Sequence, residues 1–496
     1  VPYDVDNAQG LDRWRRQYWL FCRVSEESAT FSERLKKLGD EKFVMPDAFN
    51  GCISLDLERL PDKITFIRPG AFRNCSKLAL KSLPKGITDI EAFTFTNCHA
   101  LALTSLHEEI DTIELGAFNC CFKLALTRLP SRITSIAYGT FTDCHNLALT
   151  SLPKGITEIE DNAFKNCRAL ALKSLPDGIT TIGSQAFSGC HKLALTSLPD
   201  GITQIEPWTF ASCKKLALES LPDGIVEIDN FAFFNCTTLA LTRLPDKLNY
   251  IAVAAFQNCR KLALESLPDG LSSILDDAFS SCSALALTSL PSGLTTILQS
   301  TFADCPKLAL ESLPDGILHI GSSAFLNCTA LALTSLPDGI EKVKYETFKN
   351  CHNLKLTSLP REINSIGHSA FWGCKKLVLE SLPDKLTNID VSAFQGCIKL
   401  ALESLPDGIE FIGYSAFSGC SALALTILPK NLTRIGPSAF QDCRSLALTS
   451  LPEKLTLIGY EAFMNCSAIR ITIPSQTLKN YTIGEDAFKG CPLVLF

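Results

Sequence analysis

The chain has 496 residues, of which 20% are charged, and its formal net charge is -6. A nucleic-acid-binding protein is expected to carry a basic surface, so this balance argues against that class. The mild acidity is best explained by solubility. The sequence contains neither a secretory hydrophobic region nor an apolar run of about 18 residues, and it therefore predicts no segment inserted directly in a membrane.

Residues 1–48 do not follow the pattern that fills the rest of the chain. Apolar residues recur at helical spacing over 11–24, and a second short helix is predicted over 30–38, just before Gly39. Because the ends of a repeat stack expose apolar faces, we expect 1–48 to form a small helical N-terminal cap. A basic cluster around Arg13 favours the alternative of a small interaction or targeting module.

From residue 49 to residue 496 the sequence is built from a repeat of 23 residues. Cysteine returns at every 23rd position from Cys52 to Cys466 without an insertion or deletion. Counting from each cysteine, apolar residues return at positions +3, +5, +8, +12 and +15, and phenylalanine returns at +20. Leucines at this spacing, with a fixed period of about 20–29 residues, are typical of a leucine-rich-repeat solenoid. The sequence thus predicts one solenoid domain of about 20 coils over 49–496.

Each coil divides into segments with different conformational preferences. Leu-Ala-Leu-Thr alternates apolar with small or polar residues, which favours a short parallel β-strand. The following Leu-Pro-Asp-Gly has the proline and glycine of a type I turn. We expect Ile-Thr-x-Ile to cross the coil, and the Ala-Phe segment to form one helical or 3-10 turn that points phenylalanine inward. The predicted fold class is therefore an α/β-type leucine-rich-repeat solenoid with a phenylalanine spine and a leucine core.

The chain has 22 cysteines, and twenty of them belong to the repeat. Stacking in register makes their side chains parallel, whereas a disulfide needs two side chains that turn toward each other. We therefore expect a buried ladder of free thiols that act as small hydrophobic residues. Reduced thiols fit an intracellular protein, although burial would also protect them outside the cell.

The segment Pro406–Cys420 displays the repeat signature Pro-x-x-Ile-x-x-Ile-Gly-x-x-Ala-Phe-x-x-Cys. This signature resembles the BspA-type (Treponema-type) leucine-rich repeats, and the resemblance covers about nine tenths of the chain. The expected strand reads Leu-x-Leu-x-x-Leu-Pro here, where that family usually has Leu-x-x-Ile-x-Ile-Pro. Proteins of the family are mostly bacterial or protist surface proteins that adhere to host matrix proteins or to other cells. The resemblance therefore implies an adhesive surface protein.

No motif in the sequence is typical of catalysis, since it has no P-loop, no GxSxG elbow and no HExxH. His99, His145 and His191 share one coil position but follow each other at intervals of 46 residues, which is two coils. Coils stacked about 4.8 Å apart place such histidines roughly 10 Å from each other. That distance is too long for two imidazole rings to bind one zinc ion. We predict no enzyme activity, no cofactor and no metal site.

Aromatic residues form the first set of candidate partner-binding residues, because aromatic side chains are favoured anchors at protein interfaces. Four tyrosines share position +17 and two tryptophans lie nearby in the repeat; they are Tyr138, Tyr345, Tyr414 and Tyr460, with Trp208 and Trp372. The alternative interpretation is that these side chains are partly buried and pack between turns.

Glutamates at position +6 form the second set of candidates. They are Glu219, Glu265, Glu311, Glu380 and Glu403. Stacked on one face, they would form an acidic stripe for a cationic partner, whereas isolated single carboxylates make poor calcium sites. The alternative is that the alternation of glutamate with threonine reflects duplication of a two-coil unit.

The last residues of the chain, Leu493, Val494, Leu495 and Phe496, fall within a further predicted strand. An open apolar strand edge invites pairing with another chain, so these residues are a candidate association edge. A longer natural chain, or a partner that covers this edge, are the alternatives.

Taken with the resemblance, these features favour a non-enzymatic protein-interaction or adhesion protein, located at the cell surface or secreted. Its expected partners are extracellular matrix or cell-surface proteins, and possibly a second copy of itself. Two alternatives stay open: a self-associating structural protein, and a cytoplasmic scaffold or secreted effector.

Overall fold

The computed structural model describes residues 42–471 and 482–492. The helical cap expected over 1–48, with its helices at 11–24 and 30–38, lies almost entirely outside these ranges. The first described strand, Phe43–Val44, already pairs with the strand of the next coil. The division into a cap (1–48) and a solenoid (49–496) stays a prediction.

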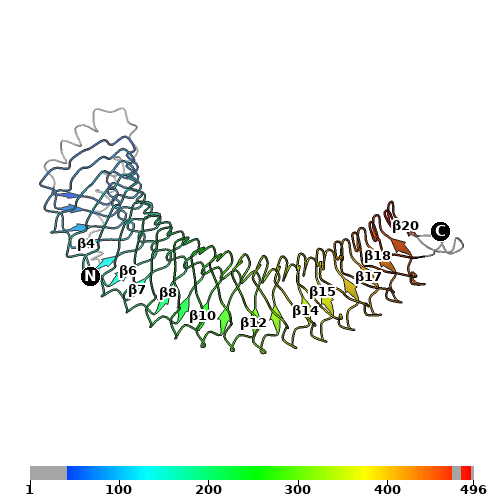
Figure 1. Cartoon of the computed structure of the whole chain (residues 1–496). Helices are drawn as coiled ribbons and strands as arrows, with labels where there is room; N and C mark the ends of the chain where they lie inside the picture. Colours follow the sequence, from blue (N-terminus) through cyan, green and yellow to red (C-terminus); the bar gives the residue numbers. More distant parts are fainter. Residues whose placement is uncertain (1–41, 472–481, 493–496) are drawn as a thin grey trace, which may run out of the picture. The chain divides into compact units, whose positions relative to one another are not determined.

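The chain forms two compact units. Of the described residues, the first unit contains those up to Ile225 together with Phe231–Leu239, and the second contains Val226–Asn230 and those from Ala240 onward. Within each unit, successive coils stack in sequence order, so that equivalent positions of neighbouring coils lie side by side (Figure 1).

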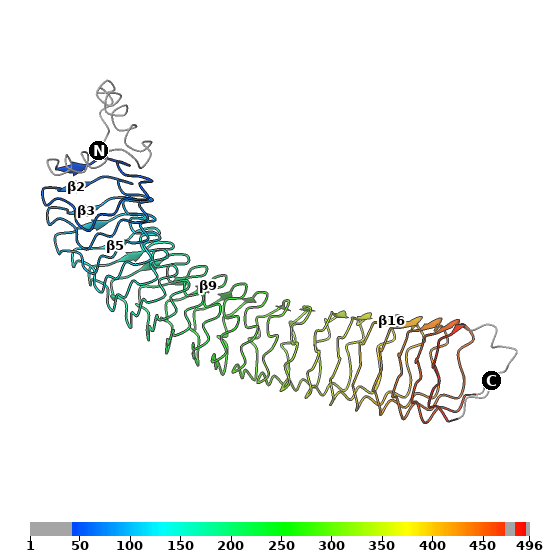
Figure 2. The same ribbon diagram turned by 90° about the horizontal axis from the view of Figure 1, so that it is seen from above.

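Each described coil contributes one β-strand of two residues, and 42–471 and 482–492 contain neither an α-helix nor a 3-10 helix. Neighbouring strands pair in parallel, so Ile412 faces Ile389 on one side and Ile435 on the other. The longest continuous sheet joins β14 to β20, and its strands run along one edge of the second unit (Figure 2). The strands are β1 (Phe43–Val44), β2 (Phe66–Ile67), β3 (Asp89–Ile90), β4 (Thr112–Ile113), β5 (Ser135–Ile136), β6 (Glu158–Ile159), β7 (Thr181–Ile182), β8 (Gln204–Ile205), β9 (Glu227–Ile228), β10 (Tyr250–Ile251), β11 (Ser273–Ile274), β12 (Thr296–Ile297), β13 (His319–Ile320), β14 (Lys342–Val343), β15 (Ser365–Ile366), β16 (Asn388–Ile389), β17 (Phe411–Ile412), β18 (Arg434–Ile435), β19 (Leu457–Ile458) and β20 (Thr482–Ile483).

The strands do not lie where the sequence predicted them, and this part of the prediction was wrong. They occupy positions +14 and +15, in Ile-Thr-x-Ile, and not the Leu-Ala-Leu-Thr run. The Leu-Ala-Leu run also bonds to the preceding coil, as from the Ala125 N–H to the Leu103 oxygen at 3.0 Å. However, many coils bend at +6 and the proline at +9 has no N–H to donate, so the ladder cannot continue there.

The helical turn expected around each phenylalanine is replaced by a run of hydrogen-bonded turns. Positions +18 and +22 adopt the left-handed conformation, with φ of 52° at Ser415 and 76° at Gly419, and such residues interrupt a right-handed helix. Alternate N–H groups consequently point toward the next coil. Those of Ser415, Phe417 and Gly419 donate to its carbonyl oxygens at 2.7–2.9 Å.

Three walls therefore enclose the core of each coil, and we name them by position. The Leu-Ala-Leu wall spans +3 to +7, the strand wall +12 to +15 and the turn wall +16 to +22; in one coil of the second unit these are residues 423–427, 432–435 and 436–442. Apolar side chains at +3, +5, +8, +12, +15 and +20 are buried in nearly every described coil, which confirms the predicted leucine core.

The predicted phenylalanine spine is confirmed in each unit. One stack of rings runs from Phe49 to Phe233 in the first unit, and another from Phe256 to Phe488 in the second. Successive ring centroids are 5.2–5.8 Å apart and the rings are within 11° of parallel. Each ring therefore contacts the ring before it and the ring after it, at a distance favourable for aromatic pairs.

The predicted ladder of thiols is also confirmed, since the cysteines of the described ranges form no disulfide and most are buried. The structure adds a reason for cysteine at this position. The Phe394 carbonyl oxygen accepts the N–H of Cys397 at 3.1 Å and the thiol of Cys420, one coil later, also at 3.1 Å. A leucine could fill the same space but could not donate to that carbonyl. Burial raises the pKa of these thiols, to about 12 at Cys98.

Candidate functional site

The four tyrosines predicted as partner-binding residues lie at the corner between the strand wall and the turn wall. Each is two residues past the end of its strand, and about half of each side chain is exposed: 52% at Tyr138, 49% at Tyr345, 44% at Tyr414 and 51% at Tyr460. The other half of each side chain is buried, so both the partner-binding interpretation and the alternative of packing between turns stay open. Tyr138 belongs to the first unit and the other three belong to the second.

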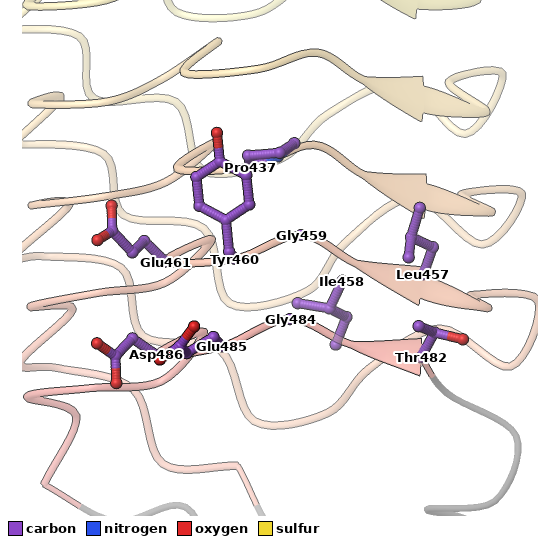
Figure 3. A pocket seen from close by; sticks show the side chains of 10 residues that line it. All are labelled: Pro437, Leu457, Ile458, Gly459, Tyr460, Glu461, Thr482, Gly484, Glu485 and Asp486. Atoms are coloured by element: carbon purple, nitrogen blue, oxygen red, sulfur yellow. The ribbon is translucent and has the colours of Figure 1, made fainter.

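In six successive coils of the second unit, the residues at position +17 form a mostly apolar column. The column consists of Tyr345, His368, Val391, Tyr414, Pro437 and Tyr460, one residue from each of six successive coils. The rings of Tyr345 and His368 stack at 5.4 Å. In Figure 3 the ring of Tyr460 reaches toward Pro437, so that these two side chains share one surface.

Glycines line the side of this column that faces the strands. Gly413, Gly436, Gly459 and Gly484 follow each other at the residue before the column. A Cβ atom added to any of them would lie 2.3–2.7 Å from backbone atoms of the preceding coil, closer than real Cβ contacts come. Close packing of the coils thus requires glycine here, and the backbone beside the column stays bare.

A hollow of about 660 Å³ occupies the last part of this glycine row. Pro437 and Tyr460 stand on one side of it, Leu457 and Thr482 stand on the other, and the glycines lie between (Figure 3). Its volume falls in the range of about 300–1,000 Å³ that is usual for ligand sites.

The first unit has a smaller hollow of about 340 Å³ at the same corner. Leu115 and Tyr138 line it from position +17, and Thr112 and Ser135 line it from the strands. Its floor includes Ala137, so a small residue again precedes the exposed aromatic side chain. Glu114 and Glu160, the residues at +16 in the coils on either side of Ala137, also line this hollow.

The main-chain N–H at position +17 faces this corner, and its acceptor differs between coils. The Tyr138 N–H donates to the Glu160 carboxylate at 2.9 Å, and the Ala92 N–H donates to the Glu114 carboxylate at 2.9 Å. At Tyr414 and Tyr460 the corresponding residue of the next coil is a glycine, which has no acceptor side chain. Within residues 42–471 and 482–492, no acceptor bonds the N–H of Tyr414 or Tyr460.

Acidic side chains lie at one end of the larger hollow. Glu461, Glu485 and Asp486 line it, and the ammonium group of Lys489 pairs with Asp486 at 2.9 Å. That hydrogen bond and the attraction to Asp486 raise the pKa of Lys489. The three carboxylates and one ammonium leave a net charge of -2, so this end of the hollow favours a cationic group.

The two predicted tryptophans lie elsewhere, on the turn wall. Trp208, 36% exposed, stacks on Phe231 with ring centroids 4.1 Å apart and contacts Phe234 edge to face. Trp372, also 36% exposed, lies under the Lys349 ammonium at 4.2 Å from the ring centroid. Neighbouring side chains thus already cover part of each tryptophan ring. The structure does not bring the two tryptophans together with the tyrosines.

The predicted acidic stripe lies on the Leu-Ala-Leu wall, apart from the tyrosine column. Its five members, Glu219, Glu265, Glu311, Glu380 and Glu403, are all exposed. The described ranges hold no group of three or more His, Cys, Asp or Glu side chains that could bind a metal ion. The stripe thus stays a prediction as a partner-binding surface.

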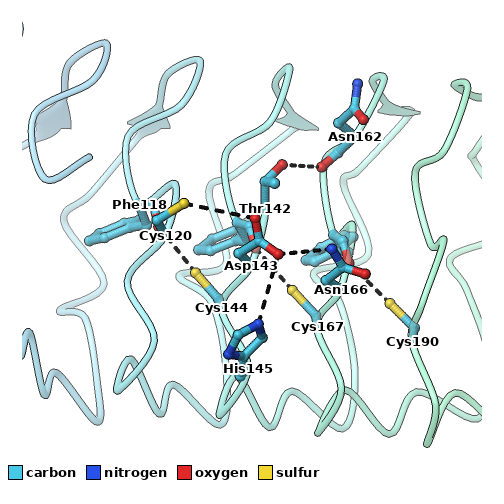
Figure 4. Close-up of polar contacts among 12 residues, drawn as sticks. Phe118, Cys120, Thr142, Asp143, Cys144, His145, Asn162, Asn166, Cys167 and Cys190 are labelled. Carbon is cyan, nitrogen blue, oxygen red and sulfur yellow. Dashed lines mark hydrogen bonds and ion pairs between the residues drawn. The ribbon is translucent and has the colours of Figure 1, made fainter. Parts of the chain in front are cut away.

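One polar cluster combines the residue types of nucleophilic enzymes, and Figure 4 displays it. Carboxylate oxygens of Asp143 lie 3.8 Å from the Cys120 sulfur and 3.8 Å from Nε2 of His145, and the Asn166 side-chain N–H donates to Asp143 at 2.8 Å. Burial and the Asp143 charge raise the pKa of Cys120, whereas an active nucleophile needs a lowered one. Asp143 also separates the thiol from the imidazole. The arrangement is that of a hydrogen-bonded ladder.

Sequence reasoning missed two features of this surface. The asparagines at +22 form a ladder, as where Asn350 donates to Asn327 at 2.8 Å and Asn327 donates to Asp304 at 2.7 Å. Recurring Asn, Asp and Gly at +22 were the available signal, because these residues tolerate left-handed backbone. The second feature is the hollow, for which the run of glycines before the tyrosine column was the signal.

The predicted association edge at 493–496 lies outside the described residues. Within 42–471 and 482–492, no helix has the length and apolar character that a membrane span requires.

Several solved structures are similar to this chain. A leucine-rich repeat protein from Bacteroides ovatus is 24% identical, with 78% of this chain and 87% of that chain covered and a TM-score of 0.43. A leucine-rich cell surface protein from Faecalibacterium prausnitzii is 24% identical, with 66% and 86% covered and a TM-score of 0.40. A leucine-rich repeat protein from T. pallidum is 32% identical, with 33% and 77% covered and a TM-score of 0.27.

No curated protein matches the sequence. The family described as the BspA type leucine-rich repeat region matches residues 42–171, 157–266, 254–378 and 379–494, which together span nearly all of the chain. The repeat signature, the stacked parallel coils and this match lead to one conclusion: the chain belongs to the BspA-type leucine-rich repeat family.

Proposed function

We propose that this chain is a non-enzymatic protein-binding protein whose main contact surface is the corner between the strand wall and the turn wall. The observation that carries the proposal is the set of half-exposed tyrosines at one coil position. Tyrosine is enriched among the residues that dominate binding energy at interfaces. The hollow beside Tyr460 supplies a concave surface where a partner side chain can be desolvated.

We further propose that the partners are extracellular matrix or cell-surface proteins and that the chain acts at the cell surface or after secretion. Membership in the BspA-type family supports this, as does the similarity to a cell surface protein from Faecalibacterium prausnitzii. Positions +3 to +5 of the Leu-Ala-Leu wall are nearly uniform from coil to coil, whereas position +17 varies. A partner that recognises one place on the solenoid can therefore distinguish one coil from another more readily at the corner, where the residues differ.

Binding to immobilised partners tests the proposal. The full chain is passed over fibronectin, fibrinogen, laminin and collagen, and over intact host cells, and saturable binding to at least one is expected. The double variant Tyr414→Ser, Tyr460→Ser should weaken that binding by at least tenfold. The matched control is Ile427→Ser, because Ile427 is 58% exposed on the Leu-Ala-Leu wall. Equal loss in the control, or no saturable binding to any surface, would overturn the proposal.

Self-association through Leu493–Phe496 stays a second proposal. Sedimentation at rising protein concentration tests it, and a chain that remains monomeric would remove it. The cytoplasmic alternative is compatible with the absence of disulfides among the described cysteines but has no further support.

A further inference from the structure

We propose that the column segment Tyr414–Pro437–Tyr460 and the adjoining hollow bind a proline-rich polypeptide in the polyproline II conformation, with a basic residue at the end near Glu485. The inference rests on the proposed protein-binding function and specifies the chemistry of the partner at that site. Four observations carry it: the spacing of the column, the open N–H donors, the bare glycine backbone and the acidic end of the hollow.

The spacing of the column matches this conformation. Stacked coils repeat at about 4.8 Å, so Tyr414 and Tyr460, two coils apart, recur at roughly 9.6 Å. A polyproline II helix rises about 3.1 Å per residue and turns once in three, which places equivalent side chains about 9.3 Å apart. An extended strand repeats one face at about 6.7 Å, and an α-helix has a pitch of about 5.4 Å. Neither of these periods matches one or two coils as closely.

The open donors suit the same ligand. The N–H groups of Tyr414 and Tyr460 face the corner without an acceptor in the described ranges, where the Glu160 side chain occupies the equivalent place in the first unit. A polyproline II segment has no internal hydrogen bonds, so its carbonyl oxygens are free to accept. Proline has no N–H, so such a ligand does not require acceptors from the surface.

The glycines and apolar side chains complete the fit. Bare backbone at Gly436, Gly459 and Gly484 lets a ligand approach the main chain closely beside the column. Tyrosine and proline side chains present flat apolar surfaces to proline rings, which is how aromatic-lined grooves recognise proline-rich segments. Leu457 closes the opposite side of the hollow.

Charge sets the direction of the ligand. Glu461 directly follows Tyr460 in the same coil, and Glu485 and the Asp486–Lys489 pair lie one coil beyond it. One coil corresponds to about 4.8 Å, or between one and two residues of polyproline II. A lysine or arginine of the ligand placed there pairs with Glu485, while prolines three residues apart occupy the column.

Peptide titration of the full chain tests the inference, followed by tyrosine fluorescence and calorimetry. The probe is a 12-residue peptide of prolines that ends in two arginines. A Gly-Ser peptide of the same length and charge tests whether charge alone is sufficient, and cellohexaose and chitohexaose test a carbohydrate ligand. Saturable binding of the proline peptide is expected, with at least tenfold weaker binding of the Gly-Ser peptide.

Variants locate the binding. Tyr460→Ala should weaken the proline peptide at least tenfold, whereas Tyr460→Phe should retain it because the ring surface remains. Glu485→Gln should weaken the arginine-bearing peptide about fivefold and leave an uncharged proline peptide unchanged. The matched control, Ile427→Ala, should bind as the parent does. Circular dichroism confirms that each variant is folded.

Three results would overturn the inference: no saturable binding of the proline peptide, equal binding of the Gly-Ser peptide, or a Tyr460-dependent preference for either oligosaccharide. If binding to a matrix protein still depends on Tyr460 in those cases, the proposed function stands and only the ligand chemistry fails. If the proline peptide binds but no matrix or cell surface does, the inference stands and the adhesive role fails.

Discussion

Raising the pH above 9 is expected to unfold this protein, because its buried thiols cannot ionise while the chain stays folded. Sixteen buried cysteines have a pKa raised by burial, for example from 9.0 to about 12 at Cys98. Well below pH 9, each thiol is protonated in both the folded and the unfolded chain. As the pH rises through 9, the unfolded chain loses protons that the folded chain keeps, so the free energy of unfolding falls up to the folded-state pKa.

The expected loss of stability exceeds what most folded proteins possess. At about pH 10, a thiol that ionises near pH 9 only in the unfolded chain lowers the free energy of unfolding by roughly 1–2 kcal/mol. Sixteen such thiols together lower it by roughly 20 kcal/mol, against a typical total stability of about 5–15 kcal/mol. Unfolding before pH 10 follows, and it should be reversible when the pH returns to neutral.

Urea unfolding followed by circular dichroism, with a reductant present, measures this effect between about pH 7.5 and about pH 9.5. Lysines, with a usual pKa of about 10.4, stay charged in this window, so the thiols dominate the change. Cys282→Val is the control. Because this variant lacks one buried thiol, its unfolding at pH 9.5 should release fewer protons, by the amount that one cysteine contributes. A urea midpoint that stays constant up to pH 10 would refute the reasoning.

Three substitutions, each compared with a control, test the packing of the second unit. Phe302→Ala removes a fully buried ring whose centroid lies 5.8 Å from both neighbours, and should cost ~3–5 kcal/mol in urea unfolding, against ~0.5 kcal/mol or less for the exposed Phe66→Ala. Gly321→Ala places a Cβ 2.5 Å from backbone of the preceding coil and should cost ~1–3 kcal/mol, whereas Gly293→Ala meets nothing closer than 3.9 Å and should lower the midpoint by little or nothing. Asn327→Ala loses two ladder hydrogen bonds at a left-handed residue (φ 59°) and should cost ~1–3 kcal/mol, and Asn327→Gly should cost less because glycine keeps the backbone relaxed. Equal midpoints within any of these pairs would contradict the packing described.

Most of the core followed from the sequence, because strict spacing leaves few ways to bury the same residues in every coil. Phe417 and Cys420 recur with the period of the stack, so their burial and their alignment with equivalent residues could be predicted. The Leu-Ala-Leu run misled the strand prediction, because its alternation looks more like a strand than Ile-Thr-x-Ile does. A strand forms where main-chain hydrogen bonds between coils can continue. The bend at +6 and the proline at +9 interrupt these bonds beside the Leu-Ala-Leu run.

The parts that sequence could not predict depend on neighbouring coils. The left-handed residue at +18 is Gly70, Asn162 or Asp277 in some coils but Trp208, Phe231 or Glu461 in others, so residue type marks this conformation in only part of the chain. The hollow depends on pairs of residues in successive coils. The Tyr460 N–H has no acceptor in the described ranges because the residue one coil later is Gly484, which has no acceptor side chain. The four tyrosines could be singled out from the sequence, but the hollow beside Tyr460 could not.

The shared phenylalanine carbonyl has a consequence for how genes of this kind change in length. Nearly every described coil receives a thiol donor from its successor and offers one to its predecessor, as Cys420 does with Phe394. A recombination event that copies or deletes a whole 23-residue segment therefore leaves each surviving coil with the same neighbours and the same bonds. The last described coil, from Cys466 to Cys491, is 25 residues long and not 23, and the Cys491 thiol still donates to the Phe463 carbonyl oxygen at 3.1 Å. Selection can thus vary the number of coils, and even the length of one coil, as long as each phenylalanine carbonyl keeps its thiol donor.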